Sequence, residues 1–133
     1  MNPLYPEVAR RADHRCEYCH APEPVFNFAF EVEHIVPVAS GGGNEGDNLA
    51  LACRSCNAFK SARRTGTDPD TGATVPLFHA RRDTWEEHFA VNPETNAMVG
   101  RTPTGRATVS LLQLNSPAQQ LARRQWRRLD LFP

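Results

Sequence analysis

The chain has 133 residues, and its 15 Lys and Arg residues balance 15 Asp and Glu residues, so its formal charge is zero. This length provides one core that buries roughly two thirds of the unfolded surface, and it argues against a second full domain. No apolar run approaches the ~18 residues of a membrane span, and the N-terminus lacks the apolar core of a signal peptide. We therefore expect a cytoplasmic protein without a membrane partner, whose cysteines stay reduced and act as metal ligands.

The first predicted element is a helix over residues 7–15, because Val8 and Ala12 lie one turn apart on its apolar side. A proline-containing loop over residues 21–24 follows. Residues 25–30 are apolar enough for a strand or a buried loop.

Residues 31–36 alternate with a period of two, which predicts a half-buried strand. Glu31, Glu33 and Ile35 would then lie on one face, and His34 on the other. A regular strand points Glu33 and His34 apart, so a strand end or a bulge is needed to bring them together.

A Gly-rich loop over residues 40–47 separates this strand from a second predicted strand over residues 48–52. Residues 53–64 then predict a knuckle that runs into a helix, which ends near Gly66. The order is strand, loop, strand and helix.

Beyond a polar linker over residues 67–73, three further helices are predicted. Their ranges are 84–89, 104–114 and 117–129. Ser116, Pro117 and Gln119 form a capping-box signature at the start of the last helix. On that helix the residues expected toward one side are Leu121, Ala122, Gln125, Trp126 and Leu129.

Two Cys-x-x-Cys pairs, Cys16/Cys19 and Cys53/Cys56, suit a closed tetrahedral Zn²⁺ site, which is structural because no coordination position stays open. The alternative, a redox disulfide of the thioredoxin type, needs only one pair, so two matched pairs favour zinc. The interval between the pairs exceeds the usual ~15–20 residues of a zinc ribbon, as an inserted hairpin would require. His20, just after the first pair, is an alternative zinc ligand.

Further motif residues lie between and after the pairs, in this order: Glu33-His34-Ile35-x-Pro37, the Gly-rich loop, Asn48-Leu49, and Cys53-x-x-Cys56-Asn57-x-x-Lys60. Together with the cysteines they resemble the HNH endonuclease family over about a third of the chain.

The resemblance implies an α+β fold: a small ββα-metal core, also called the His-Me finger, with a structural zinc knuckle and a mostly helical C-terminal extension. Residues 1–66 would form the nuclease core. Residues 67–133 would form the extension, packed on the same core as one domain.

The resemblance also implies site roles. His34 would be the general base, since an unperturbed imidazole titrates near pH ~6.5. Glu33 and Asn57, both oxygen donors, would hold a catalytic Mg²⁺ or Mn²⁺, although the family more often has Asp at the first position. Asn48 would hold the hairpin loop so that His34 keeps its orientation. The remaining histidines lack such a setting.

Fourteen of the fifteen cations are arginines, and most come in adjacent pairs, whose guanidinium groups can bind phosphate oxygens despite the zero net charge. The candidate nucleic-acid contacts are Lys60, Arg63, Arg64, Arg123, Arg124, Arg127 and Arg128. For any single pair, an ordinary solvated surface is the alternative interpretation.

The sequence therefore predicts a metal-dependent endonuclease that hydrolyses phosphodiester bonds in nucleic acid, with double-stranded DNA as the expected partner. The rival hypothesis is a non-catalytic zinc-knuckle module that binds nucleic acid or protein. Glu33, His34 and Asn57 distinguish the two, because a pure binding module does not need that set.

Overall fold

The computed structural model describes all residues, 1–133. Its helices are α1 (Tyr5–Arg11), α2 (Arg54–Lys60), α3 (Trp85–His88), α4 (Pro103–Leu111) and α5 (Pro117–Arg128). Its strands are β1 (Glu31–His34), β2 (Leu49–Ala52), β3 (Thr65–Thr67), β4 (Thr74–Pro76), β5 (Phe89–Val91) and β6 (Met98–Gly100). Short 3₁₀ turns cover Glu23–Val25, Val38–Ser40 and Gly46–Asn48.

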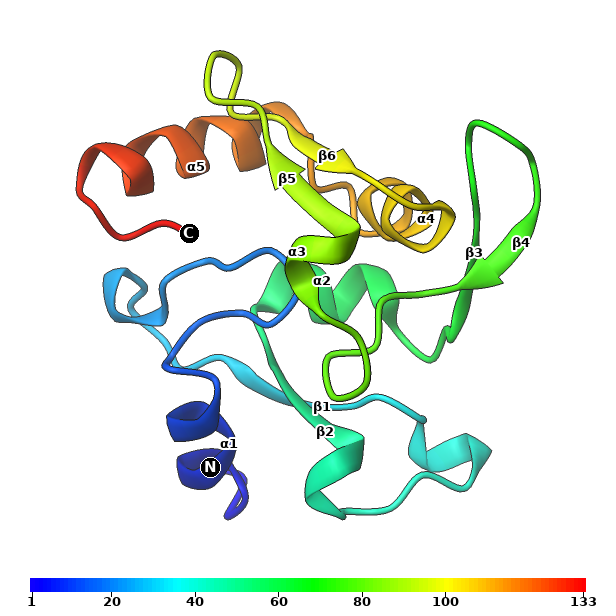
Figure 1. The fold of residues 1–133 in the computed structure, drawn as a ribbon. Helices are drawn as coiled ribbons and strands as arrows, with labels where there is room; N and C mark the ends of the chain where they lie inside the picture. The colour runs from blue at the N-terminus through cyan, green and yellow to red at the C-terminus, as the bar shows by residue number, and fades with distance from the viewer.

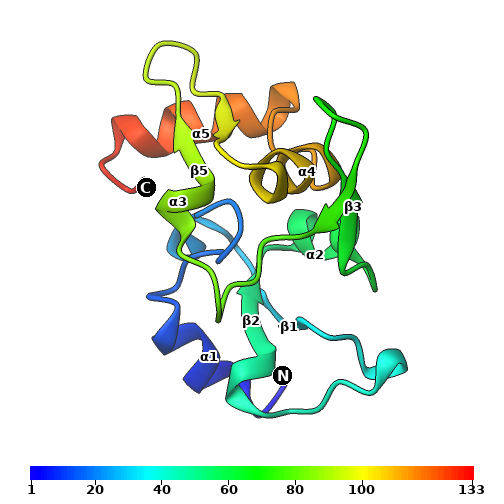
Figure 2. The same cartoon turned by 45° about the vertical axis from the view of Figure 1, so that its right-hand side comes forward.

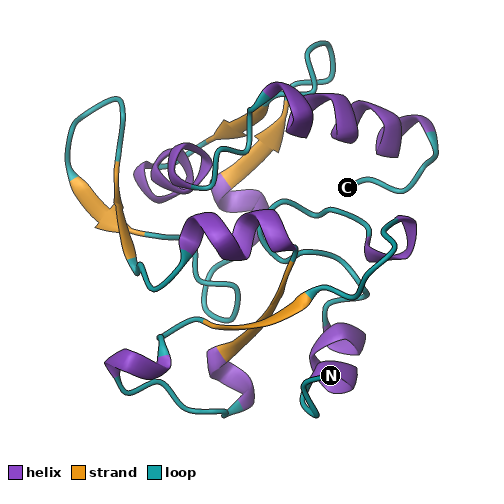
Figure 3. Ribbon diagram, turned by 180° about the vertical axis from the view of Figure 1, so that it is seen from behind, coloured by secondary structure: helices purple, strands orange, loops and turns teal.

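The elements are arranged along one axis of the molecule. The β1–β2 hairpin and α1 lie at one end, whereas α5 and the β5–β6 hairpin lie at the other (Figures 1 and 2). Seen from behind, α2 lies between these ends (Figure 3). None of the helices is long and apolar enough to cross a membrane.

β1 and β2 pair antiparallel, from Glu31 opposite Ala52 to His34 opposite Leu49. All four residues of β2 are buried, since its apolar run packs against α1 and α2. β1 ends two residues earlier than predicted, because the Asn48 side chain, rather than a strand partner, accepts the hydrogen bond of Val36 N.

α2 follows β2 directly and gives the predicted order of two strands and a helix. It begins after Cys53, whose sulfur accepts a hydrogen bond from Cys56 N at 3.4 Å. It ends at Lys60, earlier than predicted, because Ser61 adopts a left-handed φ of 51°. The fold class is α+β, as predicted.

The C-terminal segment contains two hairpins that the sequence did not predict. β3 and β4 pair across the predicted linker, so the proposed boundary after residue 66 falls inside β3. The helix predicted over residues 84–89 stops at His88, and β5 pairs with β6. The turn between β5 and β6 is closed by Asn92, whose Oδ1 accepts hydrogen bonds from Glu94 N and Thr95 N.

The last helix begins as the capping box predicted, since Ser116 Oγ accepts a hydrogen bond from Gln119 N at 3.3 Å. Its buried face differs from the prediction. Trp126 and Arg123 are buried, whereas Leu121 and Leu129 are 59% and 63% exposed.

A single cluster of 21 buried apolar residues contains residues from both the N-terminal and the C-terminal parts of the chain. It contains the four cysteines and all of β2, together with later residues that include Phe78, Phe89, Trp126 and Phe132. The later segment therefore packs directly on the cysteine knuckles.

Candidate metal and catalytic site

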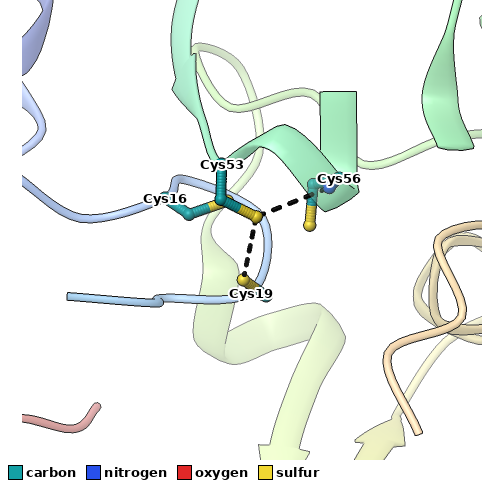
Figure 4. Close-up of side chains that lie close together, drawn as sticks. All are labelled: Cys16, Cys19, Cys53 and Cys56. Carbon is teal, nitrogen blue, oxygen red and sulfur yellow. Dashed lines mark hydrogen bonds between the residues drawn. The ribbon is translucent and has the colours of Figure 1, made fainter. Parts of the chain in front are cut away.

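The four cysteines form one compact, buried cluster. Their sulfur atoms all lie within 4.8 Å of one another, and Cys19 Sγ is 3.8 Å from Cys53 Sγ (Figure 4). Tetrahedral zinc with bonds of ~2.3 Å places its sulfur ligands about 3.8 Å apart. The cluster therefore has the size and the donor set of a structural zinc site.

Local backbone geometry builds the two knuckles. In the first, Cys16 N donates to Ala21 O and His20 N donates to Cys16 O, and these bonds fold the segment back on itself. Glu17 fastens this knuckle to β2, because its N–H donates to Leu51 O and its carboxylate accepts from Leu51 N. In the second knuckle, the start of α2 brings both cysteines to the same side.

The thiols perturb one another. Hydrogen bonds from neighbouring sulfurs, Cys16 first, lower the pKa of Cys53 far below its usual value. The pKa values of Cys19 and Cys56 are raised, first by their hydrogen bonds to Cys16. Several thiolates at this spacing need a divalent cation to offset their charge, which a bound zinc ion would supply.

His20 lies outside the sulfur cluster. Its ring stacks on Trp85, with ring centres 3.9 Å apart, and burial lowers its pKa to about 4. The alternative of His20 as a zinc ligand is therefore not supported by its position.

His34 ends β1 with a half-buried side chain. Its Nε2 lies 2.8 Å from Asn44 Oδ1, in the loop between β1 and β2. With that oxygen as the acceptor, the ring proton sits on Nε2 and Nδ1 is left free to accept a proton.

Asn48 holds the loop that carries Asn44. Its Oδ1 accepts from Val36 N at 2.8 Å, and its Nδ2 donates to Val36 O and Gly43 O. Gly42 passes so close to this junction that an added Cβ would lie 1.8 Å from Val36 O. Only glycine fits there, which explains part of the Gly-rich run.

Glu33 points the opposite way from His34, as a regular strand requires, and no bulge brings the two together. It is 3% exposed, and its Oε1 lies 2.5 Å from Lys60 Nζ. Tyr18 OH donates to its Oε2 at 2.8 Å, and burial, followed by the Glu33 charge, raises the pKa of Tyr18. Both carboxylate oxygens therefore have protein partners.

Asn57 lies one turn before Lys60 on α2 and faces Glu31 instead. Its Nδ2 donates to Glu31 Oε2, and Arg54 Nε lies 3.9 Å from Glu31 Oε1. The Glu31 side chain is 40% exposed, so this carboxylate is accessible from solvent. The prediction that Glu33 and Asn57 share one ion differs from this arrangement, in which Glu31 is the carboxylate beside Asn57.

Residues 16–63 match the family model described as HNH endonuclease. The match begins at the first zinc-knuckle cysteine and ends just after α2, so it covers both knuckles, the hairpin and the helix. This segment is an HNH domain. No curated protein and no solved structure matches the chain.

Two of the predicted nucleic-acid contacts are buried and unavailable. Lys60, at the end of the HNH domain, is 2% exposed and pairs with Glu33. Arg123 is fully buried, and its guanidinium donates to Asn96 O and Leu114 O. Both side chains are buried for the same reason: each cation satisfies acceptors inside the fold.

The other predicted arginines are accessible to different degrees. Arg127 donates to Pro93 O and to Asn96 Oδ1, whereas Arg124 and Arg128 on α5 are exposed. α5 lies at the opposite end of the molecule from the β1–β2 hairpin (Figure 1). Arg63 and Arg64, just after α2, are exposed and lie at the end of the HNH domain.

Two residues to which the sequence interpretation gave no role contact the predicted site residues. Glu31 lies on the same strand face as Glu33, two residues closer to the start of β1. Tyr18, inside the first knuckle, bonds Glu33. The period-two pattern indicated the shared face of the two glutamates, but nothing in the sequence indicated which of them meets Asn57.

Proposed function

We propose that the protein is a metal-dependent endonuclease that hydrolyses phosphodiester bonds in double-stranded DNA. The observation that carries this proposal is the HNH domain with His34 in it as an accessible imidazole. A ββα-metal active site of the His-Me finger type, built on β1, β2 and α2, is part of the same proposal.

His34 is the proposed general base. Its hydrogen bond to Asn44 leaves Nδ1 as the proton acceptor for an attacking water. Asn48 holds the loop backbone on which Asn44 lies, so it acts as a positioning residue.

Asn57 and Glu31 are the proposed holders of a catalytic Mg²⁺ or Mn²⁺. Amide and carboxylate oxygens are the donors that hard divalent cations prefer, and these two side chains already lie together with access to solvent. Glu31 lies on the face of β1 opposite His34, so a bound ion would supply positive charge to the nucleic-acid backbone from the α2 side of the hairpin. Glu33, by contrast, is proposed to be a structural partner of Lys60.

The accessible arginines are the proposed backbone contacts, namely Arg63, Arg64, Arg124, Arg127 and Arg128. Guanidinium groups bind phosphate oxygens without regard to base sequence. The proposal therefore includes weak sequence preference.

A second candidate function is a non-catalytic nucleic-acid-binding module. The observation that favours it is the engagement of Glu33 by Lys60 and Tyr18, which removes one carboxylate from the expected ligand set.

The deciding experiment incubates the zinc-loaded protein with supercoiled plasmid, with and without Mg²⁺ or Mn²⁺. We expect metal-dependent nicking, and we expect His34→Ala to reduce its rate by roughly 10²–10⁴-fold, the usual cost of losing a general base. His14→Gln is the control, because it removes an imidazole that contacts Glu23 and has no part in the proposed site. A His34→Ala protein that keeps its zinc and its DNA affinity and still nicks at the wild-type rate would contradict the mechanism.

A further inference from the structure

A hollow of about 270 Å³ opens beside the chain that leaves β1. The residues that line it include Ile35, which follows His34 in the chain, and Lys60 from α2. The opposite wall is the segment after β4, whose turn lies beside the end of β1 (Figure 1). The hollow thus lies between the HNH domain and the C-terminal segment, on the face of β1 that carries Glu33 and Ile35.

Two guanidinium groups from distant parts of the chain line this hollow. Arg64 follows α2 and Arg82 follows β4, and both are exposed. Neither side chain forms a hydrogen bond or an ion pair with the rest of the protein, unlike Arg81 beside them, which pairs with Glu17. Their charges are therefore available to a ligand.

Hydrogen bonds fix the backbone around both arginines. Leu77 N donates to Arg64 O, which connects the end of α2 to the segment after β4. The turn that carries Arg82 is closed by Asp83, whose Oδ2 accepts from His79 N, while Asp83 N donates to His79 O. One oxygen of Asp83, the acidic residue in the lining, thus accepts a hydrogen bond from the turn.

His79 adds a neutral donor to the lining. Its Nδ1 accepts hydrogen bonds from Arg81 N and Arg82 N, both at 3.2 Å, so its proton resides on Nε2. Burial, and then the charge of Arg82, lowers the pKa of His79 and keeps the ring neutral. The ring therefore offers Nε2–H as a hydrogen-bond donor and carries no positive charge near neutral pH.

Size and charge indicate the ligand class. The hollow is smaller than the ~300–1,000 Å³ typical of small-molecule sites, so a nucleoside does not fit well. The charges of the buried Lys60 and Glu33 offset each other. This leaves the two exposed guanidinium groups of Arg64 and Arg82 against the single carboxylate of Asp83. Paired guanidinium groups suit the oxygens of a phosphodiester.

We propose that this hollow binds a backbone phosphate of the DNA strand. The inference rests on the proposed nuclease function, and it assigns Arg82 and His79, outside the HNH match, to substrate binding. The C-terminal segment then contributes to the DNA site as well as to the core.

The test measures duplex DNA binding by the full-length, zinc-loaded protein in a His34→Ala background at several salt concentrations. Arg64→Ala and Arg82→Ala should each weaken binding about five- to tenfold, without regard to sequence, and reduce the salt slope by about one. Arg10→Ala is the matched control, since it removes the same charge from an exposed site on α1. If Arg64→Ala and Arg82→Ala bind DNA like Arg10→Ala, the proposal is wrong.

A second measurement separates this proposal from the nuclease proposal. With His34 intact, Arg82→Ala should raise the DNA concentration needed for half-maximal cleavage while leaving kcat nearly unchanged, because it removes ground-state and transition-state binding alike. If the arginine variants bind DNA more weakly but the wild-type protein does not cleave it, the phosphate site is supported and the nuclease proposal is wrong. If Arg82→Ala cleaves DNA with the same half-maximal DNA concentration as the wild type, the phosphate site is wrong and the nuclease proposal stands.

Discussion

The buried pair of Glu33 and Lys60 gives a prediction at the scale of single residues. Replacing Glu33 with Ala leaves the Lys60 ammonium without its partner in a site that is 2% exposed. Breaking a buried ion pair in this way costs about 3–5 kcal/mol. We therefore expect a large fall in the free energy of unfolding, measured by urea denaturation of the zinc-loaded protein.

Glu31→Gln is the matched control on the same strand face. Its side chain is 40% exposed, so its effect on stability should stay within about 0.5 kcal/mol. Its effect on cleavage should be large and partly recovered by raised Mg²⁺ or Mn²⁺, because it weakens a proposed ligand. The opposite pattern would be a Glu31→Gln protein that loses stability and a fully folded Glu33→Ala protein that loses only its catalytic metal. That result would assign the ligand role to Glu33 instead of Glu31.

At the scale of elements, Asp68 ties the β3–β4 hairpin to α4. Its carboxylate is buried, accepts two bonds from Arg106, and also accepts from Asp70 N and Thr71 Oγ1. Arg106, followed by the other donors, lowers the pKa of Asp68 well below its usual value, although burial opposes the shift.

Because the folded pKa of Asp68 lies below the unfolded value of ~3.9, the carboxylate favours folding above that pH. Its contribution disappears as the pH falls through the folded pKa. The stability difference between the wild type and Asp68→Asn should thus be constant from neutral pH to about pH 5, and should narrow below about pH 4. Urea midpoints of the two proteins check this, since both carry the same zinc site; a difference that widens in acid would contradict it.

At the scale of the whole molecule, the four-cysteine cluster lies within the single core. Structural zinc sites supply on the order of 10–16 kcal/mol, which matches or exceeds the ~5–15 kcal/mol stability of a typical protein. We expect one zinc ion per chain, and we expect any Cys→Ser change to unfold the protein. Elemental analysis with circular dichroism measures both; a fully folded protein without zinc would exclude the structural role.

The C-terminal segment, residues 67–133, should not fold alone. Its large apolar residues, such as Phe78 and Trp126, belong to the cluster that surrounds the knuckles, and β4 would lose its partner β3. Expressed separately, the segment should give poorly dispersed amide signals in NMR spectra. Well-dispersed signals would mean that the chain contains two domains.

Features set by neighbouring residues were predictable from the sequence. The spacing within each cysteine pair, the start of α2 after Cys53 and the Ser116 cap each depend on contacts within a few positions, so local geometry determines them. The β3–β4 and β5–β6 hairpins were missed because their strands have three residues each, too few for a period-two pattern to appear.

The sequence by itself determined the two cysteine pairs, the α+β class and the HNH motif, because these are patterns of residue type at fixed spacing. Only the tertiary structure decided which charged groups are available. The packing of α2 on β1 directs Glu33 to Lys60 and Glu31 to Asn57, and the position of α5 encloses Arg123. Residues on one strand face or one helix look alike in the sequence, and their surroundings differ only once distant segments have packed against them.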